Sequence, residues 1–301
     1  MPGAPGVPAI VGVLGGGRMG AGIAHAFALA GARVAVVERD AESVRMARGR
    51  VLAALMTSVE RGTTEESLEE LTARLGFGTD VDAFAEAGLV VEAVPESLEL
   101  KLDALGRVEA AVGAASDGAG AWLASNTSSI SITTLAGHLA HPERFCGLHF
   151  FNPVPASKLV EIVVGQRTAP ELTAAAAGWV TALGKSPITV QDVPGFASSR
   201  LGVAIALEAI RMLEDGVASA ADIDGAMALG YGHPMGPLKL TDLVGLDVRL
   251  GIAEYLQATL GERFAPPQLL REKVARGELG RKTGRGFYDW PKENSQPGES
   301  A

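Results

Sequence analysis

Short runs of apolar residues alternate with amphipathic stretches through the first two thirds of the chain. The apolar runs have the length of β-strands and lie at residues 9–14, 33–38, 89–94, 122–125, 145–150, 159–164 and 188–190. Helical patterns separate several of them, at residues 19–30, 98–112 and 172–183, and a long helical stretch follows residue 38. Near-continuous apolar strands that alternate with helices indicate a parallel sheet covered on both faces.

The pattern changes near residue 192. From Gly195 onward the helical periodicity is interrupted by Gly/Pro turns, such as residues 230–237, and no segment shows a convincing strand pattern. We therefore predict an α/β domain over residues 1–192, followed by a smaller all-helical domain over residues 193–301.

Charge and composition restrict the kinds of partner. The chain of 301 residues has 26 Lys and Arg against 35 Asp and Glu, a net charge of −9. This balance argues against nucleic acid or an anionic membrane as a bulk partner. No apolar run approaches the roughly 18 residues of a membrane span, and residues 1–8 lack the pattern of a secretion signal. Cys146 is the only cysteine, which suits a reducing compartment. We expect a cytoplasmic protein.

A glycine motif, GGGRMG, lies between the first predicted strand and its helix. Gly15 allows the tight turn, Gly17 lets the backbone approach a pyrophosphate, and Gly20 lets the helix pack closely on the strand. Glu38 ends the second strand, where an acidic side chain can hydrogen-bond the adenosine ribose. Glu38 would repel a 2′-phosphate and so favours NAD over NADP, although Arg39 beside it could host that phosphate.

A possible general base lies in the middle of the chain. The segment SNTSS (residues 125–129) follows a short strand, at the edge where ligands of open α/β sheets bind. His149 and Glu161 lie in the next two apolar runs, which a Pro-rich turn connects. Oxidation of a secondary alcohol needs a base for the hydroxyl proton, and histidine suits that task. His149 alone could be a structural histidine, but Glu161 among strand apolars needs a partner. A carboxylate behind the imidazole would fix its tautomer.

Eight motifs together resemble one family. They are GGGRMGAGIA, VVEAVPE, SNTSS, HFFNPVP, KLVE, PGF, HPMGP and GRGFY, in that order. This order is similar to that of the 3-hydroxyacyl-CoA dehydrogenases, and the similarity covers about residues 9–290. The chain most resembles the short 3-hydroxybutyryl-CoA dehydrogenase branch. The resemblance implies a Rossmann-type doubly wound sheet with a helix-hairpin insertion, followed by an all-helical C-terminal domain. It further implies an acyl-CoA thioester substrate, NAD as cofactor, no metal and a homodimer formed through the helical half.

The resemblance also assigns roles at the substrate. His149 matches the family's catalytic base and Glu161 its carboxylate partner. Ser128 matches a serine that contacts the substrate oxygen beside the nicotinamide, and Asn152 matches a residue at the thioester end. Arg61 falls where the family often has a lysine for the CoA phosphate, with an ordinary exposed arginine as the alternative.

The residues expected at the cofactor by resemblance are Gly15, Gly17, Met19, Gly20, Glu38, Glu96, Lys101 and Lys282. For the two lysines a solvated surface charge is the competing interpretation. We interpret Cys146 as a buried strand residue, because nothing cationic beside it in sequence would activate the thiol.

Two positions depart from the family pattern. Ser199 replaces an asparagine whose amide touches the substrate carbonyl, and Ala54 replaces a serine in the hairpin that covers the CoA. A serine hydroxyl offers one donor where an amide offers two. These exchanges leave open a 3-hydroxyacyl group on a carrier protein, or a free hydroxy acid, as the substrate. A third hypothesis is an NAD-binding module without turnover, which the His149–Glu161 pair disfavours.

Overall fold

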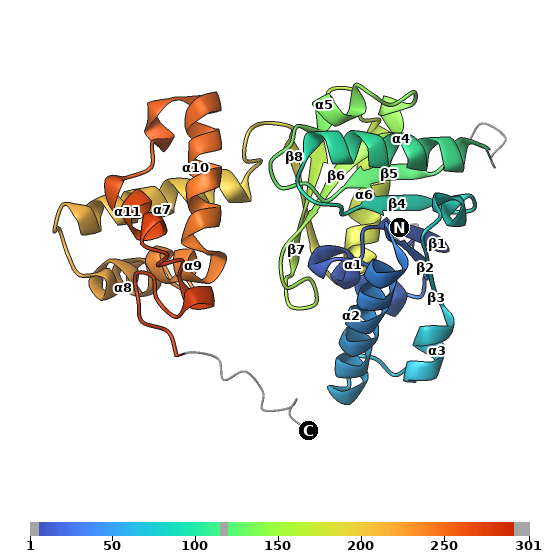
Figure 1. The fold of residues 1–301 in the computed structure, drawn as a ribbon, viewed down its shortest axis with the longest axis horizontal. Coiled ribbons are helices and arrows are strands. Elements are labelled where there is room, and N and C mark those ends of the chain that lie inside the picture. Colours follow the sequence, from blue (N-terminus) through green and yellow to red (C-terminus); the bar gives the residue numbers. More distant parts are fainter. Residues whose placement is uncertain (1–5, 115–119, 292–301) are drawn as a thin grey trace. The chain divides into compact units, whose positions relative to one another are not determined.

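The computed structural model describes residues 6–114 and 120–291. These residues form two compact units that divide between Phe196 and Ala197 (Figure 1). None of the described helices is long and apolar enough to cross a membrane.

The first unit is built on a single eight-stranded sheet. Its strands are β1 (Ile10–Leu14), β2 (Arg33–Val37), β3 (Leu75–Gly78), β4 (Leu89–Glu92), β5 (Trp122–Ser125), β6 (Phe145–Phe150), β7 (Leu159–Val164) and β8 (Ser186–Gln191). They lie in the order β3-β2-β1-β4-β5-β6-β7-β8. From β1 the chain extends the sheet on one side through β2 to β3. It then returns to the other side of β1 and extends the sheet through β4 to β8. This is the doubly wound α/β sheet predicted from the sequence.

One strand pair departs from the expected parallel arrangement. All neighbouring strands are parallel except β6 and β7, which are antiparallel. The connection between them, residues 151–158, is too short for the crossover of a dozen or more residues that parallel strands require. The antiparallel register places His149 directly opposite Glu161.

Helices cover both faces of the sheet (Figure 1). One face packs against α1 (Arg18–Leu29), α2 (Ala41–Glu60) and α6 (Pro170–Ala182). The other packs against α4 (Leu98–Ala114), α5 (Ile132–Ala136) and the 3-10 helix η1 (Val81–Phe84). Successive strand residues alternate between the two cores, so Val91 enters the first and Val90 the second. Both faces are therefore apolar, which explains the near-continuous apolar runs.

The sequence predicted neither β3 nor α5. The β3 sequence, LGFG, is four residues long and half glycine, so it carries almost no strand pattern. α3 (Leu68–Ala73) precedes it and follows α2 in the chain, so the helix hairpin has one long and one short arm. Two further 3-10 helices lie at η2 (Pro142–Arg144) and, in the second unit, at η3 (Glu262–Phe264).

The second unit is helical, as predicted. It contains α7 (Ser198–Glu214), α8 (Ala220–Gly230), α9 (Pro237–Val244), α10 (Leu246–Leu260), α11 (Gln268–Ala275) and the 3-10 helix η4 (Arg281–Thr283). Apart from the isolated bridges at Arg285, the described residues of this unit form no strand. Its core brings together residues such as Val203, Leu207, Leu246 and Leu256.

Candidate active site

A crevice opens at the carboxyl edge of the sheet, where the strand order reverses beside β1. Its cavity of about 570 Å³ is lined by the ends of β1 and β2, by the loop after β4 and by α4. Ligands of open α/β sheets bind at this kind of switch point. Gly15, Gly17, Met19 and Glu38, all predicted to bind a dinucleotide, are among the lining residues.

The glycine loop is shaped for a phosphate group. Gly15 has a φ of +93°, which favours glycine. A Cβ on Gly20 would lie 1.7 Å from the carbonyl oxygen of Gly15, whereas a Cβ on Gly17 would enter open space. Gly17 is also the N-cap of α1 and has no side chain to bind the free N–H groups of the first turn. These groups and the helix dipole suit an anion approaching over Gly17, so the loop fits a pyrophosphate.

Glu38 borders the same crevice. Its Oε1 accepts a hydrogen bond of 2.7 Å from the backbone N–H of Gly16, and its Oε2 accepts one of 3.2 Å from that of Arg39. The carboxylate is thereby fixed against the glycine loop and adds negative charge to the crevice. The guanidinium of Arg39 is exposed and pairs with Asp40.

His149 and Glu161 face each other on the neighbouring strands β6 and β7. His149 is 6% exposed and Glu161 is 0% exposed, and Nδ1 lies 2.7 Å from Oε2. Because an ionised carboxylate only accepts hydrogen bonds, Nδ1 carries the proton in this contact and Nε2 has the free lone pair. Nε2 has no hydrogen-bond partner among the residues that the structure describes. The arrangement leaves a basic nitrogen available to a hydroxyl group.

Two phenyl rings hold the imidazole. The Phe151 ring centroid lies 4.5 Å from that of His149, and the Phe196 ring centroid lies 5.8 Å from it. Phe196 is 3% exposed and has a φ of +47°, which is uncommon outside glycine. Sequence analysis missed both rings. The imidazole is thus fixed by its contact with Glu161 and by packing against two tilted phenyl rings.

The loop after β5, residues 126–131, lies beside this pair. The side-chain oxygen of Asn126 accepts a hydrogen bond of 2.9 Å from the backbone N–H of Phe150, next to His149. At the far end of the loop, Asp192 accepts hydrogen bonds from Ser131 and from the first residues of α5. The loop that contains Ser128 is therefore anchored at both ends.

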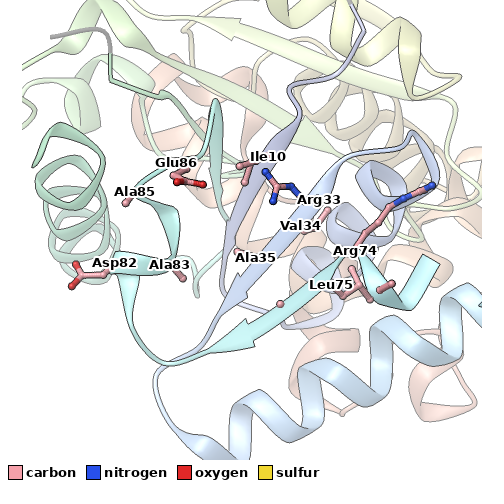
Figure 2. A pocket seen from close by; sticks show the side chains of 12 residues that line it. Ile10, Arg33, Val34, Ala35, Arg74, Leu75, Asp82, Ala83, Ala85 and Glu86 are labelled. Atoms are coloured by element: carbon pink, nitrogen blue, oxygen red, sulfur yellow. The ribbon is translucent and has the colours of Figure 1, made fainter. Parts of the chain in front are cut away.

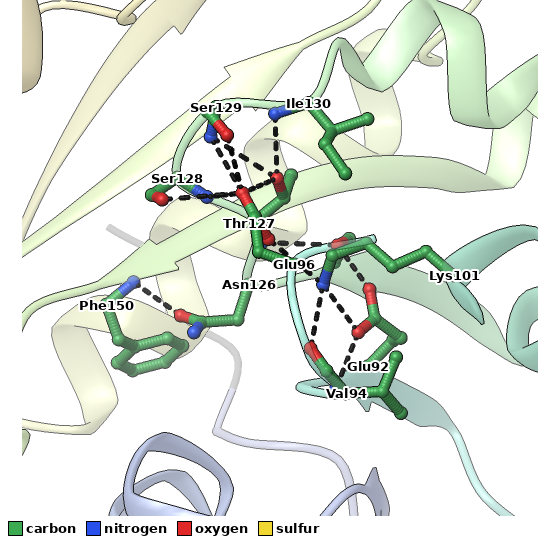
Figure 3. A network of polar contacts seen from close by, with 11 residues as sticks. Glu92, Val94, Glu96, Lys101, Asn126, Thr127, Ser128, Ser129, Ile130 and Phe150 are labelled. Atoms are coloured by element: carbon green, nitrogen blue, oxygen red, sulfur yellow. Dashed lines mark hydrogen bonds and ion pairs between the residues drawn. The ribbon is translucent and has the colours of Figure 1, made fainter. Parts of the chain in front are cut away.

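Glu96 binds the middle of this loop (Figure 3). Its Oε1 accepts from the Thr127 hydroxyl at 2.6 Å, from the backbone N–H groups of Ser128 and Ser129 at 3.0 Å each, and from the Ser129 hydroxyl at 2.9 Å. Partial burial raises the pKa of Glu96, but these hydrogen bonds and the charge of Lys101 bring the pKa below its ordinary value. Glu96 is therefore ionised at neutral pH.

Lys101 is buried, so it is not a solvated surface charge. Its side chain is 1% exposed, and its Nζ lies 2.7 Å from Oε1 of Glu92. Glu92 itself is 0% exposed and also accepts from the hydroxyl of Ser125. The sequence analysis missed Glu92, although a carboxylate inside the apolar run 89–94 needs a partner as much as Glu161 does.

The remaining predicted residues lie elsewhere. Asn152 is exposed and precedes a cis peptide bond to Pro153, and Arg61 is exposed at the end of α2. Ser199 and Lys282 belong to the second unit, where Ser199 lies in the first turn of α7 and Lys282 binds Asp247 at 2.6 Å. No group of acidic, His or Cys residues in the described ranges could hold a metal ion.

Cys146 is buried in β6, as predicted. Its side chain is 0% exposed, and burial raises the pKa of its thiol to about 12. A thiol of this kind is not a nucleophile at neutral pH.

A second cavity, of about 510 Å³, lies on the opposite edge of the sheet (Figure 2). The first residues of β1, β2 and β3 line it, together with Asp82 and Glu86 around η1. Because ligands of this fold bind at the carboxyl ends of the strands, we assign the site to the first crevice.

Comparisons with known proteins match nearly the whole chain. The family model described as 3-hydroxyacyl-CoA dehydrogenase, NAD binding domain, matches residues 10–193. The model described as 3-hydroxyacyl-CoA dehydrogenase, C-terminal domain, matches residues 195–290.

Individual relatives are similar over their full length. A probable 3-hydroxybutyryl-CoA dehydrogenase of Deinococcus radiodurans is 41% identical over 283 residues, which cover 93% of this chain and 99% of the relative. A 3-hydroxybutyryl-CoA dehydrogenase of Mycobacterium tuberculosis is 41% identical over 286 residues, covering 93% and 98%. The crystal structure of (S)-3-hydroxybutyryl-CoA dehydrogenase from Ralstonia eutropha superposes with a TM-score of 0.88 at 40% identity, covering 95% of this chain and 100% of that one.

Proposed function

Because the chain belongs to the 3-hydroxyacyl-CoA dehydrogenase family, we propose that it oxidises a short-chain L-3-hydroxyacyl-CoA, such as 3-hydroxybutyryl-CoA, to the 3-oxoacyl-CoA. The family makes it an NAD-dependent oxidoreductase and confirms the resemblance found in the sequence. The observation that carries the reaction is the buried His149–Glu161 pair, with a 2.7 Å contact at Nδ1 and a free Nε2.

In this mechanism His149 is the general base. Its Nε2 takes the proton of the 3-hydroxyl group while the C3 hydride leaves, so that the carbon–oxygen double bond forms. NAD, when bound, supplies the hydride acceptor. Glu161 holds the imidazole by the Nδ1 hydrogen bond and stabilises the charge that the ring gains with the proton. In the reverse direction His149 returns the proton to the carbonyl oxygen.

We assign the other residues by their place around this step. Gly15, Gly17, Met19 and Gly20 form the pyrophosphate cradle, and Glu38 binds the adenosine ribose. The loop anchored by Asn126 and Asp192 presents Ser128 to the substrate oxygen.

The parts of the site outside this crevice are also proposals. Asn152 takes the thioester end, Arg61 takes a phosphate of CoA, and Ser199 replaces the amide donor to the substrate carbonyl. Lys282 is proposed as a contact of the cofactor, and in the helical unit its ammonium binds Asp247.

A panel of substrates tests the proposal. The enzyme is assayed with NAD against 3-hydroxyacyl-CoA thioesters from C4 upward, including dicarboxylic ones, by the absorbance of NADH. Highest kcat/KM on a short thioester supports the proposal. The exchanges at Ser199 and Ala54 favour two competing substrates, a carrier-protein thioester and a free hydroxy acid. Those substrates are assayed at equal concentration, and higher activity with either would replace the CoA thioester.

We also propose that the protein forms a homodimer through the helical domain and that it is cytoplasmic. Large apolar side chains of the second unit are exposed, including Leu201 at 62%, Leu229 at 90% and Tyr231 at 79%. We assign these exposed apolar side chains to the proposed association surface. We assign the helical half, predicted to span residues 193–301, as a separate substrate and dimerisation domain.

A further inference from the structure

We propose that Arg50, on α2, binds the pyrophosphate of NAD beside the glycine loop. Arg50 lies outside the glycine motif, on the helix that follows β2. The inference rests on the proposed cofactor crevice and deepens it, because it assigns a charged side chain to a phosphate group that the glycine motif leaves to backbone N–H groups.

The glycine loop itself offers only a partial positive charge. The first turn of a helix contributes the equivalent of about half an elementary charge. Glu38 accepts a hydrogen bond from the backbone N–H of Gly16 at 2.7 Å, which places a full negative charge on the same loop. A cation beside the loop would therefore favour the binding of a pyrophosphate.

Four arginines line the crevice, namely Arg18, Arg39, Arg50 and Arg107. Arg39 and Arg107 each pair with an aspartate. Within residues 6–114 and 120–291, neither Arg18 nor Arg50 forms an ion pair with a carboxylate. Of these two, Arg50 contacts the glycine loop through its side chain, because its Nη1 donates a hydrogen bond of 3.4 Å to a carbonyl oxygen of the loop. Arg50 is thus a cation held at the loop without a counter-ion.

The path of α2 brings Arg50 to this position. A Cβ on Gly16 would lie 2.3 Å from the Cβ of Ala47, so α2 packs directly on the loop. Arg50 follows Ala47 by three residues and therefore lies one turn further along the same side of the helix. Ser43 and Met46, at the helical spacing from Arg50, also line the crevice. This face of α2 is a wall of the proposed cofactor site.

Most of the guanidinium remains available to a ligand. An arginine side chain has five N–H donors in a planar fork, and the long contact with the Gly16 carbonyl oxygen uses one of them. The fork matches phosphate oxygens in a bidentate manner. Gly17, the next residue of the loop, is the N-cap of α1 and provides no side-chain cap. A phosphate over Gly17 would then be bound by backbone N–H groups of α1 and by the guanidinium of Arg50.

Replacement of Arg50 by methionine tests this contact, because methionine keeps an aliphatic stem and removes the charge. Calorimetric titration without substrate gives the Kd of NAD and of ADP-ribose, which keeps the pyrophosphate but lacks nicotinamide. We expect both Kd values to rise about tenfold, which is the lower end of the range for a hydrogen bond to a charged group. Since Arg50 is exposed, the Tm without NAD should stay unchanged.

Ionic strength separates a phosphate contact from a purely structural role of Arg50 at Gly16. The Debye length falls from about 10 Å at about 0.1 M salt to about 3 Å at about 1 M. If Arg50 attracts the pyrophosphate, the ratio of the two NAD Kd values, Arg50→Met over the unchanged protein, should fall from about tenfold to about threefold or less over this range. A ratio that does not depend on salt would show that Arg50 only holds the loop, and it would overturn the proposal.

Arg48→Met is the matched control. Arg48 is exposed on the same helix, two residues before Arg50, and does not line the crevice. The substitution removes the same charge from the protein, so the Kd of NAD and the Tm should both stay unchanged. A rise in Kd equal to that of Arg50→Met would attribute the effect to net charge and not to a contact.

Two further results would overturn the proposal. One is an unchanged Kd of NAD in Arg50→Met. The other is an unchanged Kd of NAD together with a raised Kd of free CoA, which would assign Arg50 to the phosphates of the substrate. Failure of the crevice itself is distinguishable, because Glu38→Ser would then also leave the preference between NAD and NADP unchanged. Since no substrate is present in the NAD titrations, the outcome is independent of the proposed reaction.

Discussion

Replacement of His149 by glutamine tests the proposed base directly. Glutamine keeps a polar group of similar length but cannot accept a proton at neutral pH, so the 3-hydroxyl proton has no acceptor. Loss of a positioned general base typically lowers the rate by about 10²- to 10⁴-fold, or roughly 3 to 5 kcal/mol of barrier. The crevice proposed to bind NAD is built from β1, β2 and the loop after β4, so the Kd of NAD should stay nearly unchanged.

Glu161→Gln measures how much Glu161, the hydrogen-bond partner of His149, contributes to kcat. The 2.7 Å contact is buried, with Glu161 0% exposed, and a hydrogen bond to a charged group is worth about 1.5 to 3 kcal/mol. The expected loss of kcat is therefore about 10- to 150-fold. The two losses should not add, because both residues act on one proton. The combined variant should be no slower than His149→Gln alone.

Initial rates from NADH absorbance with 3-hydroxybutyryl-CoA provide the measurement, with NAD titrated separately. His141→Gln is the control, because His141 also faces a carboxylate, Glu143 at 3.3 Å, but both side chains are more than half exposed. Its rate should equal that of the unchanged enzyme. Near-normal turnover in His149→Gln, or fully additive losses in the pair, would refute the mechanism.

Three further predictions concern the cofactor, substrate and assembly. Glu38→Ser should narrow the preference for NAD over NADP by roughly tenfold, about 1.4 kcal/mol, because Arg39 then meets the 2′-phosphate without a competing carboxylate. The preference is measured as kcat/KM with each cofactor, and an enzyme without the substitution that prefers NADP would contradict the prediction. Ser199→Asn should raise activity on acetoacetyl-CoA by about 2- to 10-fold through one further hydrogen bond, whereas a loss would indicate a pocket shaped around serine. Leu229→Asp should produce monomers in light scattering, because a charge would be buried at the proposed interface; a monomeric unchanged chain refutes the dimer.

Two patterns in the sequence, apolar runs of strand length and helical periodicity, predicted the fold. Apolar runs at 122–125, 145–150 and 159–164 coincide with strands, because a sheet covered on both faces makes every strand position apolar. The same rule failed at β3, where two glycines leave too few apolar side chains to form a run. The rule also indicated parallel strands and so missed the antiparallel pair of β6 and β7. There the short connection 151–158 excludes a parallel crossover, and the antiparallel register places His149 opposite Glu161.

Glu92 shows why part of the site was not predicted. Glu161 and Glu92 are both carboxylates within apolar strands, and burial requires a partner for each. For Glu161 the partner is on the neighbouring strand, and two successive family motifs, HFFNPVP and KLVE, contain the two residues. For Glu92 the partner is Lys101, on a helix that also carries an exposed cation, Arg107, so the sequence alone gave no reason to bury the lysine. Spacing along a chain identifies a residue that needs a partner, whereas the choice among several possible partners depends on how the helix packs against the sheet.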